Sequence, residues 1–406
     1  MNKQQEPRLR FKGFTGTWEE KTLNDVSEVF EYGLNAQAVN FDGVHKYIRI
    51  TDIDDESRQF LQENVTSPDV DFLKADNYKL QKGDLLFART GASVGKSYLY
   101  NENDGLVYFA GFLIRAKLNK EVDDQFIFQN TLTNHFNRFV TLTSQRSGQP
   151  GINSKEYSEF EFLAPTLPEQ THLGLFFSRL DSQIAESRAV LEKSRQLKKA
   201  MLEKMFPTNG EKIPEIRFKG FDGEWEYRKL GEVASSYSGG TPSVGNSKFY
   251  SGNIPFIRSG EIHSSKTELF LTQEGLENSS AKLVKQGDIL YALYGATSGE
   301  VERSKINGAI NQAILAIIPN ENYDAEFISQ WLKNNKENIV NLYLQGGQGN
   351  LSGEIVKKIE ISFPTKKEQT AIGNFFRQLD ETIALQTAEV EKLNQLKKGL
   401  LAAMLV

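Results

Sequence analysis

The stretch that comes nearest to a catalytic motif is GASVGKS at residues 91–97. A phosphate-binding loop needs the spacing G-x-x-x-x-G-K-S/T, because its backbone N–H groups must close around a phosphate. Here Gly91 and Gly95 are one residue too close together, and the related stretch GATSGEV at 295–301 has no lysine. The stretch therefore predicts a glycine-rich turn that allows close backbone approach, and no nucleotide site.

Residues that could hold a metal or act as nucleophiles are scattered along the chain. The four histidines, His45, His135, His172 and His263, are far apart, have no matching carboxylate cluster, and are accompanied by no cysteine. No glycine-rich fingerprint opens a dinucleotide-binding helix. We therefore expect no catalytic site, no metal, and no cofactor bound by this chain.

Two polar loops carry the chemistry of recognition. SQRSGQPGIN at 144–153 and LQGGQGNLS at 344–352 place Gln, Asn, Ser and Arg around glycines. Gln and Asn can form paired hydrogen bonds with adenine and Arg with guanine, and Gly permits close approach of the backbone. Solvated turns have the same composition, so each loop alone leaves both interpretations open. Their recurrence at equivalent places favours recognition.

The element that follows each loop is itself duplicated. PTLPEQTHLGLFFSRLD at 165–181 returns as PTKKEQTAIGNFFRQLD at 364–380 with ten of seventeen positions identical, and QLKK follows each copy. Thr166 and Glu169 have the spacing of a capping box, in which a hydroxyl and a carboxylate satisfy free backbone N–H groups at a helix start. The second copy repeats this spacing, so each copy predicts the start of a long helix.

Apolar residues continue both predicted helices at heptad spacing, with polar breaks at Ser187, Ser194 and Lys198 and at Gln386 and Lys397. Such a narrow apolar stripe must be buried for the helix to be stable. The simplest arrangement packs the two helices together as an intramolecular coiled coil; the alternative is two separate amphipathic helices, each on its own domain. The heptad residues are Leu180, Ile184, Leu191, Met201 and Met205, and Leu379, Ile383, Val390, Leu393, Leu400 and Met404.

The duplication extends to the segments that precede the helices. PRLRFKGFTGTWEEKTLNDV at 7–26 matches PEIRFKGFDGEWEYRKLGEV at 214–233, and KGDLLFARTGASVGK at 82–96 matches QGDILYALYGATSGE at 286–300. Between these matches the copies share little, which is expected if two equivalent modules recognise different things. Short β-type runs are predicted at 46–50, 84–88, 253–259, 288–294 and 313–319, and a helix late in each unit at 124–140 and 325–340.

We therefore expect an α+β fold with two tandem pseudo-symmetric domains separated by two long antiparallel helices. The predicted segments are a first domain at 1–164, a first long helix at 165–206, a linker at 207–213, a second domain at 214–363 and a second long helix at 364–406. With a net charge of −5, a large uniformly basic surface is not expected. The absence of cysteine and of an apolar membrane-length run predicts a cytoplasmic protein with no membrane partner.

The duplicated P-T-x-x-E-Q-T…F-F…L-D helix starts, QLKK, the R-F-K-G-F…W openings and G-D-L/I-L-F/Y-A together resemble the specificity subunit of type I restriction-modification enzymes, the HsdS family. The resemblance covers nearly the whole chain. It implies two target recognition domains that read the halves of a bipartite DNA sequence, and, because the inserts differ, an asymmetric target.

The resemblance also implies partners. These are double-stranded DNA, two adenine methyltransferase subunits that bind S-adenosylmethionine, and motor-nuclease subunits that use ATP and Mg²⁺; the chain itself would be non-catalytic. A duplicated protein-binding scaffold is the alternative function, and a self-contained enzyme a weaker third. The candidate DNA-binding residues are Arg49, Arg89, Thr90, Ser93, Lys96, Gln145, Arg146 and Gln149, and Arg258, Tyr294, Thr297, Ser298, Gln345, Gln348 and Asn350.

Overall fold

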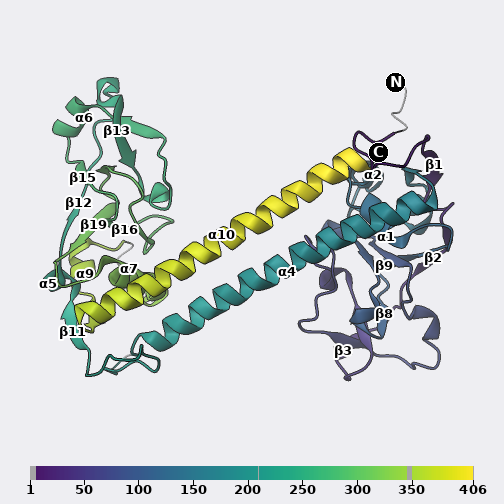
Figure 1. Cartoon of the computed structure of the whole chain (residues 1–406), viewed down its shortest axis with the longest axis horizontal. Helices are drawn as coiled ribbons and strands as arrows, with labels where there is room; N and C mark the ends of the chain where they lie inside the picture. Colours follow the sequence, from purple (N-terminus) through teal and green to yellow (C-terminus); the bar gives the residue numbers. More distant parts are fainter. Residues whose placement is uncertain (1–5, 209, 345–349, 406) are drawn as a thin grey trace. The chain divides into compact units, whose positions relative to one another are not determined.

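The computed structural model describes residues 6–208, 210–344 and 350–405. These residues form two compact units (Figure 1). Unit 1 runs from the described N-terminus to Val190 and includes the residues from Gln386 onward, and unit 2 is Leu191–Leu385. Each unit therefore contains one α+β body and a part of both long helices.

Unit 1 is built around two four-stranded sheets. The first has the order β2 (Ser27–Tyr32), β9 (Leu113–Leu118), β6 (Asp84–Ala88), β7 (Ser97–Leu99), and the second β3 (Ala38–Asn40), β5 (Thr66–Pro68), β4 (Lys46–Ile48), β8 (Val107–Phe109). β1 (Glu19–Thr22) pairs with β10 (Glu161–Ala164). The short helices are α1 (Asp124–Asn130), α2 (Asn134–Thr143) and α3 (Ser154–Ser158), with 3-10 turns at Ile50–Asp52, Asp76–Tyr78, Gly91–Ser93 and Glu102–Asp104.

Unit 2 repeats the first sheet and the separate strand pair of unit 1, whereas its second four-stranded sheet has a different order. Its sheets have the orders β12 (Ala234–Ser238), β19 (Ile314–Pro319), β16 (Ile289–Ala292), β17 (Val301–Arg303), and β14 (Leu269–Leu271), β13 (Tyr250–Ile257), β18 (Gly308–Ile310), β15 (Lys282–Val284). β11 (Glu226–Lys229) pairs with β20 (Glu360–Phe363). The helices are α5 (Leu230–Val233), α6 (Gln273–Glu277), α7 (Ala325–Asn334), α8 (Lys336–Leu344) and α9 (Gly353–Lys357), with 3-10 turns at Ser247–Phe249 and Ser259–Glu261.

The predicted strands are found, and each predicted late helix is present but divided. The run at 84–88 coincides with β6, whose five residues are all buried. The helix expected at 124–140 separates into α1 and α2 because Thr133 begins a new helix: its side chain accepts a hydrogen bond from the backbone N–H of Phe136. In unit 2 the corresponding helix divides at Asn335 into α7 and α8.

The two long helices are α4 (Leu167–Met205) and α10 (Lys366–Met404), and they are antiparallel (Figure 1). In unit 1 the first part of α4 shares an apolar core with the last part of α10, including Phe177 and Met404. In unit 2 the last part of α4 shares a core with the first part of α10, including Met205 and Phe376. Each long helix therefore packs both on the other helix and on an α+β body, which combines the two arrangements considered from the sequence.

The heptad residues form the inner stripe of this helix pair. Those that are buried are Leu180, Ile184, Leu191, Met205, Val390 and Met404, and those that are half-buried are Met201, Leu379, Ile383, Leu393 and Leu400. The polar breaks Lys198 and Lys397 are also half-buried, and each finds a carboxylate partner: Asp380 at 2.5 Å and Asp181 at 2.5 Å, respectively.

The duplicated helix-start motif holds each α+β body to its long helix. Glu169 is 2% exposed, and its two carboxylate oxygens accept hydrogen bonds of 2.7 Å from Nε and Nη2 of Arg10. Glu368, 0% exposed, accepts the equivalent bonds of 2.6 and 2.7 Å from Arg217. Each long helix begins where the capping-box spacing predicts, and both oxygens of its Glu also bind an arginine from the R-F-K-G-F opening of the same unit.

Two further residues of the motif contact the start of a short helix. Gln170 accepts a hydrogen bond of 3.2 Å from the backbone N–H of Asp123, the residue that caps α1. A Cβ placed on Gly174 would lie 2.1 Å from the Asp123 carboxylate oxygen, so only glycine lets α1 approach α4 this closely. Gln369 and Gly373 make the same approach to Asp324, which caps α7 in unit 2.

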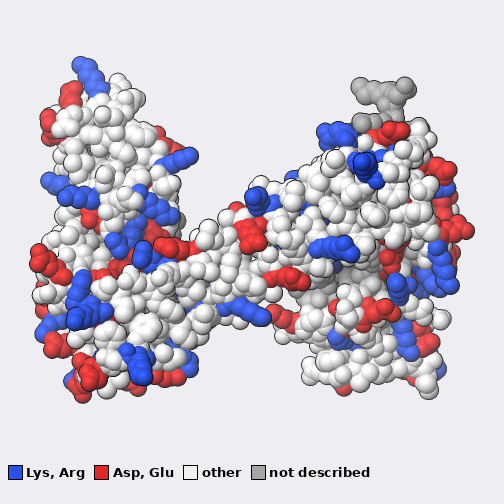
Figure 2. Space-filling model, viewed as in Figure 1, with Lys and Arg blue, Asp and Glu red and all other residues white. Residues whose placement is uncertain are grey.

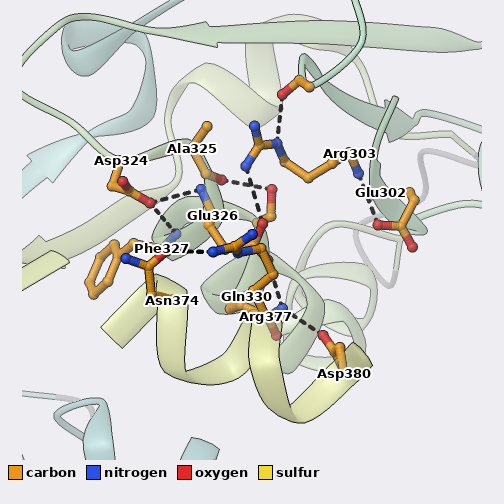
Figure 3. Close-up of polar contacts among 12 residues, drawn as sticks. Glu302, Arg303, Asp324, Ala325, Glu326, Phe327, Gln330, Asn374, Arg377 and Asp380 are labelled. Carbon is orange, nitrogen blue, oxygen red and sulfur yellow. Dashed lines mark hydrogen bonds and ion pairs between the residues drawn. The ribbon is translucent and has the colours of Figure 1, made fainter. Parts of the chain in front are cut away.

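The aspartate that ends each motif completes this attachment. In unit 2, Gln330 of α7 points toward Asp380 of α10, and its Nε2 donates a hydrogen bond of 2.8 Å to Asp380 Oδ2 (Figure 3). Gln129 of α1 donates to Asp181 in the same way, at 2.7 Å. The repeated motif therefore attaches each α+β body to its long helix. The spacing that the two copies share follows from the geometry of these contacts.

Candidate nucleic-acid interface

In unit 1 the fold brings together the two segments that carry most of the candidate residues. The backbone N–H of Gly91 donates to the carbonyl of Pro150 at 3.0 Å, and that of Ile152 donates to the carbonyl of Arg89 at 2.9 Å. The segment after β6 and the loop at 144–153 therefore lie side by side. Gly91 has a φ of 72° and Gly95 a φ of 84°, which confirms the predicted glycine-dependent turn.

The side chains at this junction differ in solvent exposure. Gln145 and Gln149 are exposed, whereas Arg89, Thr90 and Ser93 are half-buried. A Cβ on Gly91 would lie 2.9 Å from Nε2 of Gln149, so the turn and the loop fit closely. The exposed amides and the half-buried arginine form a compact polar surface at one end of the first sheet.

Unit 2 builds the same junction with different side chains. The backbone N–H of Leu351 donates to the carbonyl of Leu293 at 3.0 Å, as Ile152 does to Arg89 in unit 1. Tyr294, Thr297 and Ser298 are half-buried, and the Ser298 hydroxyl donates to the carbonyl of Leu293 at 3.2 Å. Asn350 is exposed. The candidates Gln345 and Gln348 lie outside the described residues.

Two candidates of unit 1 are paired with protein groups. Lys96 is 7% exposed; its ammonium lies 2.6 Å from a carboxylate oxygen of Asp55 and donates to the carbonyl of Ile53 at 2.9 Å. The guanidinium of Arg146 donates to both carboxylate oxygens of Glu156, at 2.5 and 2.7 Å. Both cations therefore stabilise the unit itself, and a contact of either with DNA stays a prediction.

Arg49 and Arg258 occupy equivalent places and pair with acids. Arg49 donates to both oxygens of Asp52, at 2.8 and 2.9 Å, and Arg258 to Glu261 at 3.0 Å and to Glu268 at 2.6 Å. Burial alone would raise the pKa of Glu261, but hydrogen bonds from Arg258 and from the backbone of Glu268 outweigh it and lower this pKa to about 2. Both arginines therefore form local ion pairs, and a contact of either with DNA stays a prediction.

Sequence reasoning missed two aromatic residues beside Arg89. The guanidinium carbon of Arg89 lies 5.1 Å from the ring centre of Tyr32 and 5.8 Å from that of Phe112. Both rings are partly solvent-exposed, Tyr32 by 43% and Phe112 by 57%. The signal that could have found them is their place in the sheet, because Tyr32 ends β2 and Phe112 precedes β9, which pairs with it.

On the face shown in Figure 2, basic and acidic side chains are interspersed over both units. Charges of one sign therefore do not dominate this face. In the described part of the chain, no group of three or more His, Cys, Asp or Glu side chains is arranged to hold a metal ion. Nor does any helix of that part combine the length and apolar character needed to cross a membrane.

Comparison with known proteins gives consistent matches over both units. The family model described as "Type I restriction modification DNA specificity domain" matches residues 15–193 and 222–395. The MjaVIII specificity subunit of a type I restriction enzyme from Methanocaldococcus jannaschii is 23% identical over 86% of this chain and 84% of its own length. The EcoR124I/EcoR124II specificity subunit from Escherichia coli is 28% identical over 39% of this chain and 42% of its own length.

The fold has a solved counterpart. The crystal structure of a type I restriction-modification S subunit from M. genitalium superimposes with a TM-score of 0.69 at 15% identity, covering 99% of each chain.

Proposed function

Because the chain belongs to the type I restriction-modification DNA specificity domain family, we propose that it reads a bipartite, asymmetric DNA target, with one recognition unit on each half. The chain is the specificity subunit of a type I restriction-modification complex and has two recognition domains.

The proposal rests on a backbone junction that is the same in both units but presents different side chains. In both units the segment after the central strand is hydrogen-bonded to the polar loop, through Ile152 with Arg89 and through Leu351 with Leu293. The side chains presented at the two junctions differ. Two surfaces with the same backbone and different hydrogen-bonding groups are suited to two different base sequences.

The long helices offer a matching pair of surfaces for two identical methyltransferase subunits. Leu197 and Leu396, the leucines of the two QLKK motifs, are 47% and 50% exposed. The lysine that follows each leucine is used internally, by Asp380 and Asp181 respectively. An apolar residue left exposed at the same place in both copies of a motif supports docking of one partner type at two places.

The subunit is proposed to be non-catalytic. Within the proposal, S-adenosylmethionine binds to the two methyltransferase subunits, ATP and Mg²⁺ to the motor-nuclease subunits, and the whole complex works on double-stranded DNA in the cytoplasm. The candidate residues of this chain are hydrogen-bonding groups suited to bases, and their task in this scheme is binding alone.

The test is a genome-wide map of N6-methyladenine in the source cells with and without the gene. Loss of methylation at one bipartite motif on deletion is the expected result, and the two halves of that motif should have different base sequences. Unchanged methylation in cells that express the partner methyltransferase would contradict the proposal and favour a protein-assembly scaffold.

A further inference from the structure

The cluster of Arg89, Tyr32 and Phe112 has features that a purely structural arginine does not need. The Nε–H of Arg89 donates to the carbonyl of Gly111 at 3.1 Å, which fixes the side chain at its inner edge. The two rings lie against the guanidinium. Contact with aromatic rings and one anchoring hydrogen bond orient the planar fork and leave its terminal nitrogens for another acceptor.

Arg89 is one of the arginines of unit 1 that pair with no carboxylate among the described residues, and it combines this with an orienting hydrogen bond and two ring contacts. Arg49, Arg115 and Arg146 each pair with a carboxylate. Among the described residues, none places a carboxylate within ion-pair distance of Arg89, and none accepts a hydrogen bond from its terminal nitrogens. A half-buried guanidinium that is oriented but not neutralised is arranged for an acceptor from outside the unit.

Unit 2 lacks this cluster, and the strand registers show which residues replace it. Tyr32 lies opposite Ile114, as Ser238 lies opposite Leu315. The backbone N–H of Arg89 donates to the carbonyl of Phe112, as that of Leu293 donates to the carbonyl of Ala313. The trio Tyr, Arg and Phe of unit 1 therefore corresponds to Ser, Leu and Ala in unit 2.

This replacement argues against a role in the fold. Both units build the same first sheet and the same backbone junction, yet only unit 1 has the arginine and its two rings at this junction. A residue needed for the junction itself would be required twice. A difference confined to one unit is expected of a group that reads one half of the target.

We propose that Arg89 binds a guanine in the half of the DNA target read by unit 1, donating two hydrogen bonds from its terminal nitrogens to O6 and N7 of the base. Guanine presents these two acceptors side by side in the major groove, which matches the arginine fork. Tyr32 and Phe112 are positioning residues that hold the fork in place. The inference rests on the proposed function of the chain.

The experiment compares base preference at every position of the target for the complete complex with its methyltransferase subunits. Wild-type complex and the Arg89→Lys variant are each bound to a DNA library and the bound sequences are read. Lysine keeps the charge but loses the planar fork, so a phosphate contact would survive while paired hydrogen bonds to guanine would not. Arg138→Lys is the matched control, because Arg138 is an exposed arginine of the same unit.

The expected result is that the wild type requires guanine at a position in one half, and that Arg89→Lys weakens this requirement about tenfold or more while the other half is read as before. Arg138→Lys should leave all preferences unchanged. Phe112→Leu keeps apolar contact without the ring, and we expect it to weaken preference at the same position by a smaller factor.

Three results would overturn the inference: unchanged base preference in Arg89→Lys, weaker binding that is uniform over all sequences, or a wild-type half-site without guanine. Each of these still allows a bipartite target to be read. Failure of the wild-type complex to select any bipartite sequence is a different outcome, which overturns the proposed function itself. Thermal unfolding of each variant, compared with the wild type, shows whether the fold is kept.

Discussion

Nζ of Lys198 lies 2.5 Å from Oδ1 of Asp380, and this ion pair joins the two long helices within unit 2. Asp380 also accepts a hydrogen bond from Gln330, so one carboxylate connects α4, α10 and α7 (Figure 3). Lys397, Asp181 and Gln129 form the same connection in unit 1. The lysine of QLKK and the aspartate that ends the helix-start motif, conserved between the copies, are thus partners across the helix pair.

Asp380→Asn should destabilise unit 2 by about 1–2 kcal/mol, because the variant leaves the half-buried ammonium of Lys198 without its counter-charge. Urea unfolding of the full chain measures the change. Asp181→Asn should cost a similar amount in unit 1, and the exchange of both charges in Lys198→Asp with Asp380→Lys should recover part of the loss. Equal stability of wild type and Asp380→Asn would show that the pair contributes nothing.

Glu368→Ala should have a larger effect, about 3–5 kcal/mol, because it leaves the guanidinium of Arg217 partly buried without its bidentate partner. Chemical denaturation followed by tryptophan fluorescence is a suitable measurement, since Trp225 is buried in the core of the same unit. The double variant Arg217→Met with Glu368→Leu is the control, and it should be more stable than Glu368→Ala. If Glu368→Ala is more stable than the double variant, the buried pair of Arg217 and Glu368 does not hold the R-F-K-G-F segment to the long helix.

Gly174→Ala should destabilise unit 1 by about 1–3 kcal/mol, although alanine is the better helix former. The added methyl group would lie 2.1 Å from the Asp123 carboxylate and 3.0 Å from the backbone nitrogen of Phe126, so α1 must move away from α4. Gly399→Ala is the matched control in α10, because no atom beyond the adjoining residues and the backbone of its own helix lies within 4 Å of a Cβ placed there. We expect Gly399→Ala to leave the melting temperature unchanged or to raise it.

Glu261 should make the stability of unit 2 depend measurably on pH in the acid range. Its pKa in the folded chain, about 2, lies below the ordinary value of 4.5, so folding favours the ionised form. The stabilisation, about 3 kcal/mol by linkage, is present above pH 4.5 and is lost as the pH falls through the folded pKa. The stability difference between wild type and Glu261→Gln should therefore be constant from pH 7 to about 5 and shrink toward pH 2. A difference that does not change with pH would contradict this assignment.

Lys96→Met should lower stability without changing which DNA is read. The lysine is buried and held by Asp55 and by the carbonyl of Ile53, so its replacement alters the interior of unit 1 and not its surface. The measurement is base preference of the complete complex, with thermal unfolding alongside. A changed base preference at one position in Lys96→Met would instead support a contact between this lysine and DNA.

The sequence by itself determined the duplication, the α+β class of the two bodies, the long helices and their heptad stripe. These features follow from local patterns: apolar spacing that fits one kind of element, and motifs such as PTxxEQT that return unchanged. The bounds of β6 were also predictable, because five consecutive buried residues between polar turns suit only a strand in the middle of a sheet.

Tertiary structure decided what each polar residue does. Glu169 has the spacing of a helix cap, but Arg10 approaches from a distant part of the chain and takes both its oxygens. Lys96 and Arg89 are close in sequence and similar in charge, yet one is enclosed by the 53–55 segment and the other rests between exposed rings. The strength and availability of a charged group depend on burial and on partners brought by folding, and neither is a local property of the sequence.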